Sequence, residues 1–302
     1  MTVELPASPS HDGTGDELGL ANQRELVVAA LRYIQRFSGT RAVIKYGGAA
    51  MVDPELKRKF AHDVVLLRAA GLRPIVVHGG GPEINRTLEM LGQKSQFIDG
   101  QRVTGPEEIK VVEMVLTGKV NTEIVGLINS LGGAAMGLSG KDGRLIQARK
   151  QVPKPGKPDL GLVGDVEAVN PDVLDMCLER GYIPVISPVG ASTDGTTFNI
   201  NADVAAAEIA VALKARKLIF LTDVAGILDE NGALLSALKA SDLRGRLGAG
   251  SAVKGGMQVK ANAILRALEG GVEAVHVVDG RSPHSVVVEL FTDRGAGTLV
   301  TA

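Results

Sequence analysis

The chain has 302 residues, of which 45% are hydrophobic and 22% are charged, a balance typical of a globular protein with a sizeable core. The formal net charge is -1, since 33 lysines and arginines are balanced by 34 aspartates and glutamates. No global basic field is present to attract nucleic acid, and an aromatic content of 3% offers few surfaces for base stacking. We therefore expect no nucleic-acid partner.

The first residues lack the features of a targeting signal. Residues 1–19 are rich in Pro, Ser, Gly and Asp, without a basic start or an apolar run, and we interpret them as a disordered leader. No apolar run reaches the roughly 18 residues that suggest a membrane span, so we expect no membrane partner. Cys177 is the only cysteine, which fits a reducing, cytoplasmic setting, and we interpret it as a buried, small apolar residue.

Short runs that are apolar throughout, without alternation, predict the strands of a parallel sheet buried on both faces. Helical patterns alternate with these runs, which predicts right-handed strand–helix–strand units. The predicted fold class is therefore α/β, an open αβα sandwich with a mainly parallel central sheet. The expected strands are residues 42–45, 74–77, 183–186, 218–221 and 274–278.

Several helices have clear start and stop signals. Asp53 followed by Pro54 predicts an N-cap and a first helical turn, and Gly71 closes that helix. An amphipathic helix before the first strand packs either on its own domain or on another subunit. The further helices expected are residues 20–37, 106–131 with an interruption near Gly118, 170–181, 201–215 and 256–270.

Two stretches depart from the alternating pattern. Residues 140–168 are rich in turns with short alternating pieces, which predicts β-hairpins laid over the sheet edge. Residues 229–255 carry glycines and charges without a strand signal, and we interpret them as a flexible insertion near a ligand.

Glycines cluster where the predicted strands end, which is the edge of an open α/β sheet that binds ligands. The first strand runs into residues 45–48 (KYGG), and the second into residues 78–82 (HGGGP) directly before a helix. Glycine backbones and helix N-termini bind anions, and Lys45 adds a positive charge. Neither a GxxxxGK[ST] loop nor a GxGxxG fingerprint occurs here. The pattern predicts an anion site of another kind.

Later strand ends carry further polar groups. Asn201 can cap the helix that follows FNINAD, whereas Asn199 and Asp203 are not needed for capping. A carboxylate at this place either binds a metal or holds cationic side chains. Residues 222–227 (TDVAGI) form a polar turn suited to a nucleotide, and residues 254–257 (KGGM) open a helix that contains Lys260, which suggests a second phosphate site.

The motifs VIKYGG, VVHGGGPEIN, DGQRVT, FNINAD, LTDVAGIL and GGMQVK occur in this order. Together they resemble the acetylglutamate kinases of the amino-acid kinase family, over roughly residues 40–302. The resemblance implies transfer of the γ-phosphoryl group of ATP to N-acetyl-L-glutamate, the second step of arginine biosynthesis, with Mg²⁺ carried by the nucleotide. It also implies three parts: residues 1–38 (leader and interlacing helix), 39–212 (N-acetylglutamate lobe) and 213–302 (ATP lobe with arginine-site elements).

The resemblance also implies roles for individual residues. Lys45 and Lys260 flank the transferred phosphoryl group, Asp203 holds both lysines, and the N–H groups of Gly48 and Gly80 bind its oxygens. No base is needed, because a glutamate carboxylate has a pKa of about 4.3 and is already ionised. No protein ligand for a metal is expected.

The implied binding residues divide between the two substrates. Arg102 clamps the α-carboxylate of N-acetylglutamate through two parallel hydrogen bonds, which lysine cannot make. The remaining residues implied for this substrate are Gly79, Gly80 and Asn199. Those implied for ATP are Thr222, Asp223, Val224, Gly226, Ile227, Lys254, Gly256 and Met257.

The resemblance extends to regulation, because the family divides into arginine-insensitive dimers and arginine-inhibited hexamers. The helix at residues 20–37 occupies the place of the helix that interlaces dimers in the hexamers. His276, Glu289 and Gly295 resemble the arginine site, with His276 expected at a strand end. We therefore expect L-arginine to inhibit and the chain to form a hexamer, a trimer of dimers.

Two alternatives remain open at this point. One is a kinase on the same fold that acts on aspartate, carbamate or a nucleoside monophosphate. The other is a non-catalytic arginine sensor. The presence of Lys45, Lys260 and Asp203 argues against a sensor, because arginine binding needs none of them.

Overall fold

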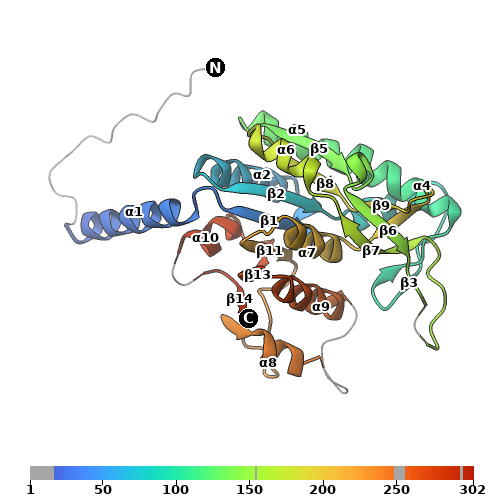
Figure 1. Cartoon of the computed structure of the whole chain (residues 1–302). Helices are drawn as coiled ribbons and strands as arrows, with labels where there is room; N and C mark the ends of the chain where they lie inside the picture. Colours follow the sequence, from blue (N-terminus) through green and yellow to red (C-terminus); the bar gives the residue numbers. More distant parts are fainter. Residues whose placement is uncertain (1–16, 154, 248–255, 293–294) are drawn as a thin grey trace.

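The computed structural model describes residues 17–153, 155–247, 256–292 and 295–302. An eight-stranded sheet lies at its centre, with helices on both faces (Figure 1). Six neighbouring strands, β5, β8, β2, β1, β11 and β13, run parallel, and β14 is antiparallel to β13. In spatial order the strands are β12 (Ala237–Lys239), β14 (Thr298–Thr301), β13 (Ala274–Asp279), β11 (Lys217–Thr222), β1 (Arg41–Tyr46), β2 (Arg73–His78), β8 (Ile183–Ser187) and β5 (Ala135–Ser139).

This architecture confirms the predicted α/β class and all five predicted strands, which are β1, β2, β8, β11 and β13. The sequence did not predict the edge strands β5 and β12, or β14 between β12 and β13. Most residues of β5 are partly exposed and one is Gly137, so the strand lacks a continuous apolar run. Outer strands bury less surface than central ones, which weakens their sequence signal.

One face of the sheet is covered by α6 (Asp172–Glu179), α7 (Ala202–Ala212) and α9 (Gly256–Glu269), with the short α8 (Ala240–Gly245) beside them. Helix α7 contacts β1, and its central alanines, Ala205, Ala206, Ala207 and Ala210, are fully buried. Small side chains let a helix approach a sheet closely, so the first turn of α7 lies near the sheet. Asn201 caps α7 as predicted, accepting hydrogen bonds from the N–H groups of Asp203 at 2.9 Å and Val204 at 3.2 Å.

The opposite face is covered by α2 (Pro54–Ala69), α3 (Gly81–Met90), α10 (Ser285–Phe291) and a long composite helix. Asp53 caps α2 as predicted, because its carboxylate accepts from the N–H groups of Glu55 at 2.8 Å and Leu56 at 3.0 Å. Two helical layers thus enclose the sheet, which is the predicted αβα sandwich.

The composite helix is α4 (Pro106–Glu113), a π-helical segment (Met114–Val120) and α5 (Asn121–Ser130). The interruption predicted near Gly118 is therefore wrong: the chain stays helical and changes only its hydrogen-bond period. π-Helical turns are frequent at functional sites. Here Leu116 and Val120 lie against Gly80, at the end of β2.

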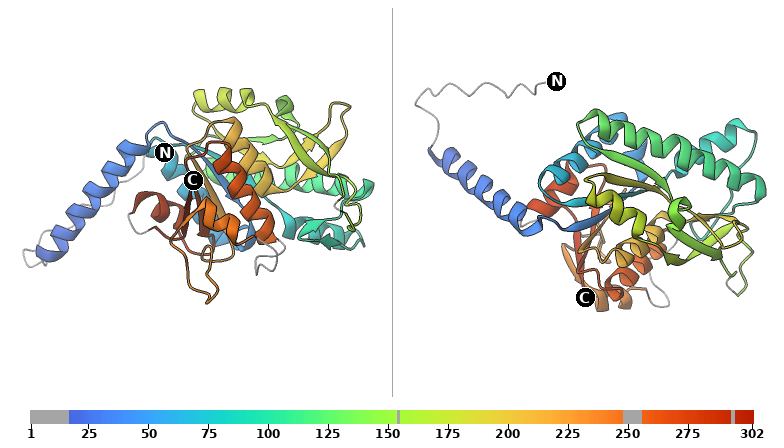
Figure 2. Two further views of the ribbon diagram at one scale, coloured as in Figure 1. Left: turned by 60° about the horizontal axis from the view of Figure 1, so that its bottom comes forward. Right: turned by 45° about the horizontal axis from the view of Figure 1, so that its top comes forward.

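Helix α1 (Glu17–Phe37) confirms the predicted first helix and projects away from the rest of the molecule (Figure 2). Its last residue, Phe37, is 4% exposed, and its ring centroid lies 6.2 Å from that of Phe291 in α10. Further out, Val27, Val28 and Leu31 are 58%, 48% and 55% exposed. The predicted disordered leader falls largely on residues 1–16, outside the described residues.

Four short strands pair in a closed ring beside the main sheet: β6 (Ile146–Lys150), β7 (Val163–Val169), β9 (Val189–Ala191) and β10 (Thr197–Ile200). The antiparallel β6–β7 pair confirms a hairpin within residues 140–168. The sequence did not predict that β9 and β10, both from later in the chain, complete a separate sheet with this hairpin. A further small hairpin joins β3 (Phe97–Ile98) to β4 (Gln101–Arg102).

The interpretation of residues 229–255 as an insertion without a strand is also corrected. This stretch contains β12 and α8, and Leu238 and Leu243 are buried in the core. Both elements are very short, so they leave little periodicity to detect. Residues 248–255 lie outside the described residues.

Candidate active site

Three charged side chains from separate elements meet near the carboxyl end of β1. Lys45 is the penultimate residue of β1, Asp203 lies in the first turn of α7, and Lys260 lies near the start of α9. The Nζ of Lys45 is 3.1 Å from Oδ1 of Asp203, and the Nζ of Lys260 is 2.9 Å from Oδ2. One carboxylate therefore lies between two ammonium groups.

Burial strongly affects this cluster. Burial on its own raises the pKa of Asp203, but the charges of Lys45 and Lys260 outweigh it, and the net pKa is lowered. Burial also lowers the pKa of Lys260, an effect that the charge of Asp203 opposes. Two lysines against one carboxylate leave an excess positive charge in a site of low exposure, which is suited to attract a phosphoryl group.

The glycines that follow β1 and β2 are closely packed against neighbouring side chains. Gly48 has φ of 73°, and a Cβ built there would lie 2.2 Å from Oδ1 of Asp223. Gly80 precedes α3, and a Cβ there would lie 2.5 Å from Cδ2 of Leu116. Either side chain would displace a neighbour. Glycine is therefore required at both places, and Gly80 precedes the N-terminus of α3, where backbone N–H groups can bind an anion.

His78 supports the second glycine run from inside the protein. Its Nε2 lies 3.1 Å from Nδ2 of Asn121, and its Nδ1 lies 2.8 Å from the carbonyl oxygen of Gly79. The amide donates to Nε2, so Nδ1 carries the proton and donates to Gly79. Burial lowers the pKa of His78 to about 4, so the ring is neutral at pH 7. The N–H of Gly79 donates to the carbonyl oxygen of Tyr46 at 2.8 Å, so it is already occupied.

Arg102, in β4, is only 7% exposed. Its Nη1 donates to Oγ of Ser95, its Nη2 donates to the carbonyl oxygen of Gly81 at 3.3 Å, and the guanidinium lies 4.7 Å from the Phe97 ring centroid. Burial lowers the pKa of Arg102. Among the described residues, Arg102 forms no ion pair with a carboxylate. A buried guanidinium bonded to neutral groups alone is suited to bind a carboxylate ligand.

Asn199 lies in β10 and is connected to the Arg102 segment through Thr104. The Nδ2 of Asn199 donates to Oγ1 of Thr104 at 3.1 Å, and that hydroxyl donates to the carbonyl oxygen of Arg102 at 3.1 Å. Thr104 is fully buried. The structure thus links two residues predicted for one substrate, which are almost a hundred positions apart in the chain.

The segment predicted to bind the nucleotide follows β11. The carbonyl oxygen of Thr222 accepts from the N–H of Gly280 at 2.8 Å, at the end of the neighbouring strand β13. The N–H of Ile227 donates to Oγ1 of Thr298 at 2.8 Å. These bonds fix the two ends of the turn, while Asp223 between them lies against Gly48.

The other residues predicted for ATP lie on the same turn and on α9. Val224 is half-buried and Gly226 is buried in the turn, while Gly256 and Met257 begin α9, which also carries Lys260. Lys254 lies outside the described residues.

Comparison with known proteins identifies this set of elements. The model of the amino acid kinase family matches residues 40–279. The chain belongs to the amino acid kinase family. Within it, the chain groups with the acetylglutamate kinases: that of Thermoanaerobacter sp. (strain X514) is 50% identical over 289 residues, covering 95% of this chain and 94% of the relative. That of Acinetobacter baylyi is 51% identical over 287 residues, covering 93% and 94%.

Solved structures extend the family relationship to other activities. An N-acetylglutamate synthase from Neisseria gonorrhoeae, complexed with coenzyme A and N-acetylglutamate, superposes with a TM-score of 0.82 at 27% identity, covering 92% of this chain and 63% of the synthase. A carbamate kinase from Giardia lamblia bound to AMP-PNP superposes with a TM-score of 0.63 at 16% identity, covering 87% and 99%, and shares the fold.

A polar cavity of about 460 Å³ lies between the end of α1 and the C-terminal strands. Its lining includes three residues predicted for arginine, His276, Glu289 and Gly295. The lining also carries Arg36 and Lys217. The structure thus brings together the three residues predicted to bind arginine. Helix α1 contributes Arg36 to the same cavity.

His276 and Glu289 form the buried end of this cavity. Nδ1 of His276 lies 2.6 Å from Oε1 of Glu289, and its Nε2 lies 3.0 Å from Nζ of Lys217. The other oxygen of Glu289 accepts from the N–H groups of Ala296 at 2.6 Å and Gly297 at 3.0 Å. His276 is the third residue of β13, so its expected place at a strand end is wrong. A guanidinium binding Glu289 would have to share or replace these partners.

Lys217 is a functional candidate that the sequence reasoning missed. Burial lowers its pKa to about 8, and its Nζ lies 4.8 Å from the Phe37 ring centroid. A lysine that starts an otherwise apolar strand is the signal that could have pointed to it. Asn121 was missed as well, because nothing in its helical surroundings distinguishes it from a surface residue.

Proposed function

We propose that this chain transfers the γ-phosphoryl group of ATP to the γ-carboxylate of N-acetyl-L-glutamate, giving N-acetyl-L-glutamyl 5-phosphate and ADP. This reaction is the second step of arginine biosynthesis. The observation that carries the proposal is the Lys45–Asp203–Lys260 cluster beside two glycine-rich strand ends. The chain that holds it is half identical, over most of its length, to acetylglutamate kinases.

The proposed chemistry consists of alignment and charge stabilisation. The acceptor carboxylate has a pKa of about 4.3 and is ionised at neutral pH, so it attacks the γ-phosphorus without a base. Lys45 stabilises charge on the acceptor side and Lys260 on the leaving side, while Asp203 positions both. The N–H groups of Gly48 and Gly80 bind phosphoryl oxygens.

Magnesium in this proposal is carried by the phosphates of ATP and supplies further positive charge to them. Both oxygens of Asp203 already face ammonium groups, at 3.1 and 2.9 Å, so we assign this carboxylate to the lysines. The nucleotide binds over Thr222, Asp223, Val224, Gly226 and Ile227 and the start of α9, with Lys254, Gly256 and Met257.

The acceptor substrate binds with its α-carboxylate on Arg102. Asn199 and the backbone of Gly79 and Gly80 complete its site, with Gly79 contributing through atoms other than its bonded N–H. In this division residues 39–212 form the N-acetylglutamate lobe and residues 213–302 the ATP lobe. Residues 1–38 contribute the leader and the interlacing helix.

Regulation by L-arginine is the finer part of the proposal. Arginine inhibits by binding in the cavity of about 460 Å³ lined by His276, Glu289 and Gly295. A Neisseria gonorrhoeae N-acetylglutamate synthase complexed with coenzyme A and L-arginine superposes with a TM-score of 0.78 at 25% identity, covering 92% of this chain and 65% of the synthase.

The assembly proposed is a hexamer, a trimer of dimers joined through α1. The exposed Val27, Val28 and Leu31 on a projecting helix support contact with another copy. The proposed compartment is the cytoplasm, where ATP is available. None of the described helices is both long and apolar enough to cross a membrane.

The test is ADP release, followed by a coupled assay, with N-acetylglutamate, aspartate, carbamate and UMP as acceptors. We expect turnover with N-acetylglutamate above the other acceptors, and a loss of rate when L-arginine is added. A preference for another acceptor would reject the substrate assignment, and absence of turnover with all four would favour a sensor. Native mass measurement tests the hexamer.

A further inference from the structure

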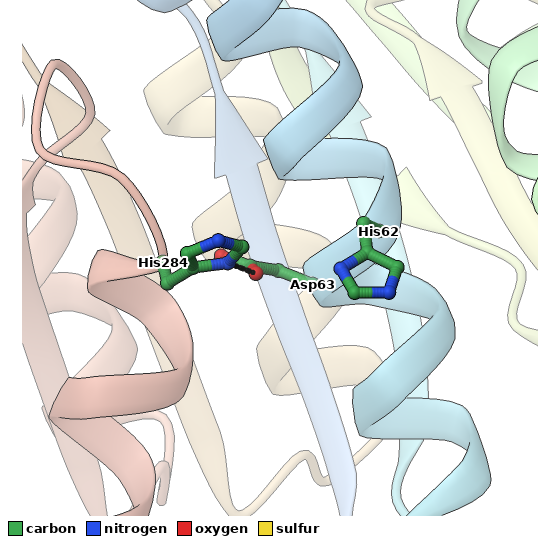
Figure 3. Close-up of side chains that lie close together, drawn as sticks. All are labelled: His62, Asp63 and His284. Carbon is green, nitrogen blue, oxygen red and sulfur yellow. Dashed lines mark hydrogen bonds and ion pairs between the residues drawn. The ribbon is translucent and has the colours of Figure 1, made fainter. Parts of the chain in front are cut away.

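A cluster of metal-ligating side chains lies between α2 and the start of α10, and nothing in the proposed reaction uses it. His62 and Asp63 belong to α2, and His284 precedes α10. One ligand atom from each of the three lies within 4.8 Å of the other two. Figure 3 shows Asp63 between the imidazoles, pointing toward His284.

Asp63 is the buried member of this cluster, with 3% of its surface exposed. Its Oδ1 lies 2.6 Å from Nδ1 of His284. Burial raises the pKa of Asp63, while the two histidines act in the opposite direction. Among the described residues, the ion pair of Asp63 is with His284 and not with a lysine or arginine. A carboxylate held inside a protein needs a compensating positive charge, which a bound cation supplies.

The backbone of His284 is in the left-handed region, with φ of 58°. This conformation is uncommon for residues other than glycine and costs of order 1 kcal/mol or more. It turns the imidazole from the loop before α10 toward α2 (Figure 3). The loop therefore stores strain in order to place this ring beside Asp63.

A small recess adjoins the carboxylate and the ring. Asp63 and His284 both line it, and its volume is about 10 Å³. That volume accommodates roughly one water molecule. Lys59 is the cationic residue that also lines the recess. His62 does not line this recess, which has room for one bound water beside Asp63 and His284 and none for an organic ligand.

The third ligand, His62, is exposed and can reorient. Its ring centroid lies 6.1 Å from that of His284, and the ring planes are inclined at 74°. Two imidazoles on one tetrahedral ion, with metal–nitrogen distances of about 2 Å, have ring centres roughly 5 Å apart. The side chain of His62 is exposed, so its rotation is the movement by which we expect this difference to close.

Two imidazole nitrogens and one carboxylate oxygen form a donor set that suits Zn²⁺ and neighbouring divalent transition metals. We propose that His62, Asp63 and His284 bind one divalent transition-metal ion, with water at the remaining position. On binding, bonds to the ion replace the Asp63–His284 hydrogen bond: the neutral imidazole carries its proton on Nε2, and Nδ1 of His284 and Oδ1 of Asp63 become ligands. The ion joins α2 to α10, which carries Glu289 of the arginine cavity.

The experiment uses the full chain, treated with a chelator and dialysed, and then titrated with Zn²⁺ against a chromogenic competitor. We expect one ion per chain. His62→Gln and His284→Gln should each weaken affinity by at least about tenfold, and the thermal midpoint should rise with Zn²⁺ only while both histidines are present. His11→Gln is the matched control and should bind as the unchanged chain does; His11 lies outside the described residues.

Binding that is equally tight in the His62→Gln variant would overturn the proposal, because the ion would then be bound without His62. Less than one equivalent bound to the unchanged chain would overturn it as well. Asp63→Asn should lose binding as well. Because Asp63 is buried, this substitution can also disturb folding, so the test relies on the variants of the two exposed histidines. The readouts are binding and melting, so the result does not depend on the proposed kinase activity.

Discussion

Asp203 and Lys260 form a buried ion pair, with 2.9 Å between Oδ2 and Nζ and exposures of 8% and 6%. Asp203→Asn keeps the shape of the side chain and removes the charge that positions Lys260 and Lys45. We expect kcat to fall by at least about 100-fold, with KM values changed far less, because the loss falls on transition-state stabilisation. Steady-state kinetics with both substrates measures this.

Glu208→Gln is the matched control for that substitution. Glu208 is on the same helix, α7, and pairs with Arg266 at the surface at 2.8 Å. Surface pairs contribute little to stability, so we expect near-normal kinetics and melting. If Asp203→Asn and Glu208→Gln behaved alike, Asp203 would have no role in positioning the lysines.

Lys45→Met removes the ammonium on the acceptor side while keeping most of the apolar stem. Asp203 retains Lys260 as a partner, so the fold should persist. We expect kcat to fall at least about 100-fold, with a thermal midpoint within a few degrees of the unchanged chain. Lys57→Met, which breaks only a surface pair with Glu123, serves as the comparison. Retained turnover in Lys45→Met would reject the assigned role.

Arg102→Lys tests the substrate clamp. Lysine keeps the charge but cannot bind a carboxylate through two parallel hydrogen bonds. We expect KM for N-acetylglutamate to rise at least about tenfold, with KM for ATP unchanged. The sharper comparison uses an N-acetylglutamate analogue amidated at the α-carboxylate, for which the unchanged chain and the variant should perform equally. A lysine variant that discriminated between the two acceptors as strongly as the unchanged chain does would contradict the assignment.

Glu289→Gln tests the arginine cavity. The amide oxygen can still accept from the N–H groups of Ala296 and Gly297, while the negative charge is lost. We expect the arginine concentration for half-inhibition to rise at least about tenfold, with the uninhibited rate unchanged. Glu269→Gln, at a surface pair with Arg244, should leave inhibition as it was. Equal inhibition in both variants would show that arginine does not bind at Glu289.

His78 predicts an acid-labile fold. Its pKa is about 4 in the folded chain and about 6.5 when exposed, so below pH 6.5 the unfolded chain takes up a proton that the folded chain does not. Stability is therefore lost as the pH falls from about 6.5 to about 4, by up to about 3 kcal/mol from this group. Urea unfolding at several pH values should show a flatter pH dependence for His78→Gln. If stability depended on pH equally in the variant and the unchanged chain, a group other than His78 would cause the acid sensitivity.

The sequence by itself determined the centre of the fold and its local signals. The central strands are apolar throughout because they are buried on both faces, and Asp53 and Asn201 cap the helices that they precede. The glycine runs after β1 and β2 marked the ligand edge of the sheet. Each of these signals depends on a few consecutive residues, so it can be recognised in the sequence. The edge strands β5 and β12 and the four-residue β14 were missed because short strands that are not apolar throughout leave no such pattern.

The tertiary structure alone decided which distant groups meet. The resemblance implied that Asp203 serves Lys45 and Lys260, but the distances of 3.1 and 2.9 Å result from α7 packing closely on the sheet beside α9. His284 and Asp63 are 221 positions apart, and no local pattern relates them. Contacts of this kind depend on how buried faces pack, and packing is set by the whole core rather than by any one segment.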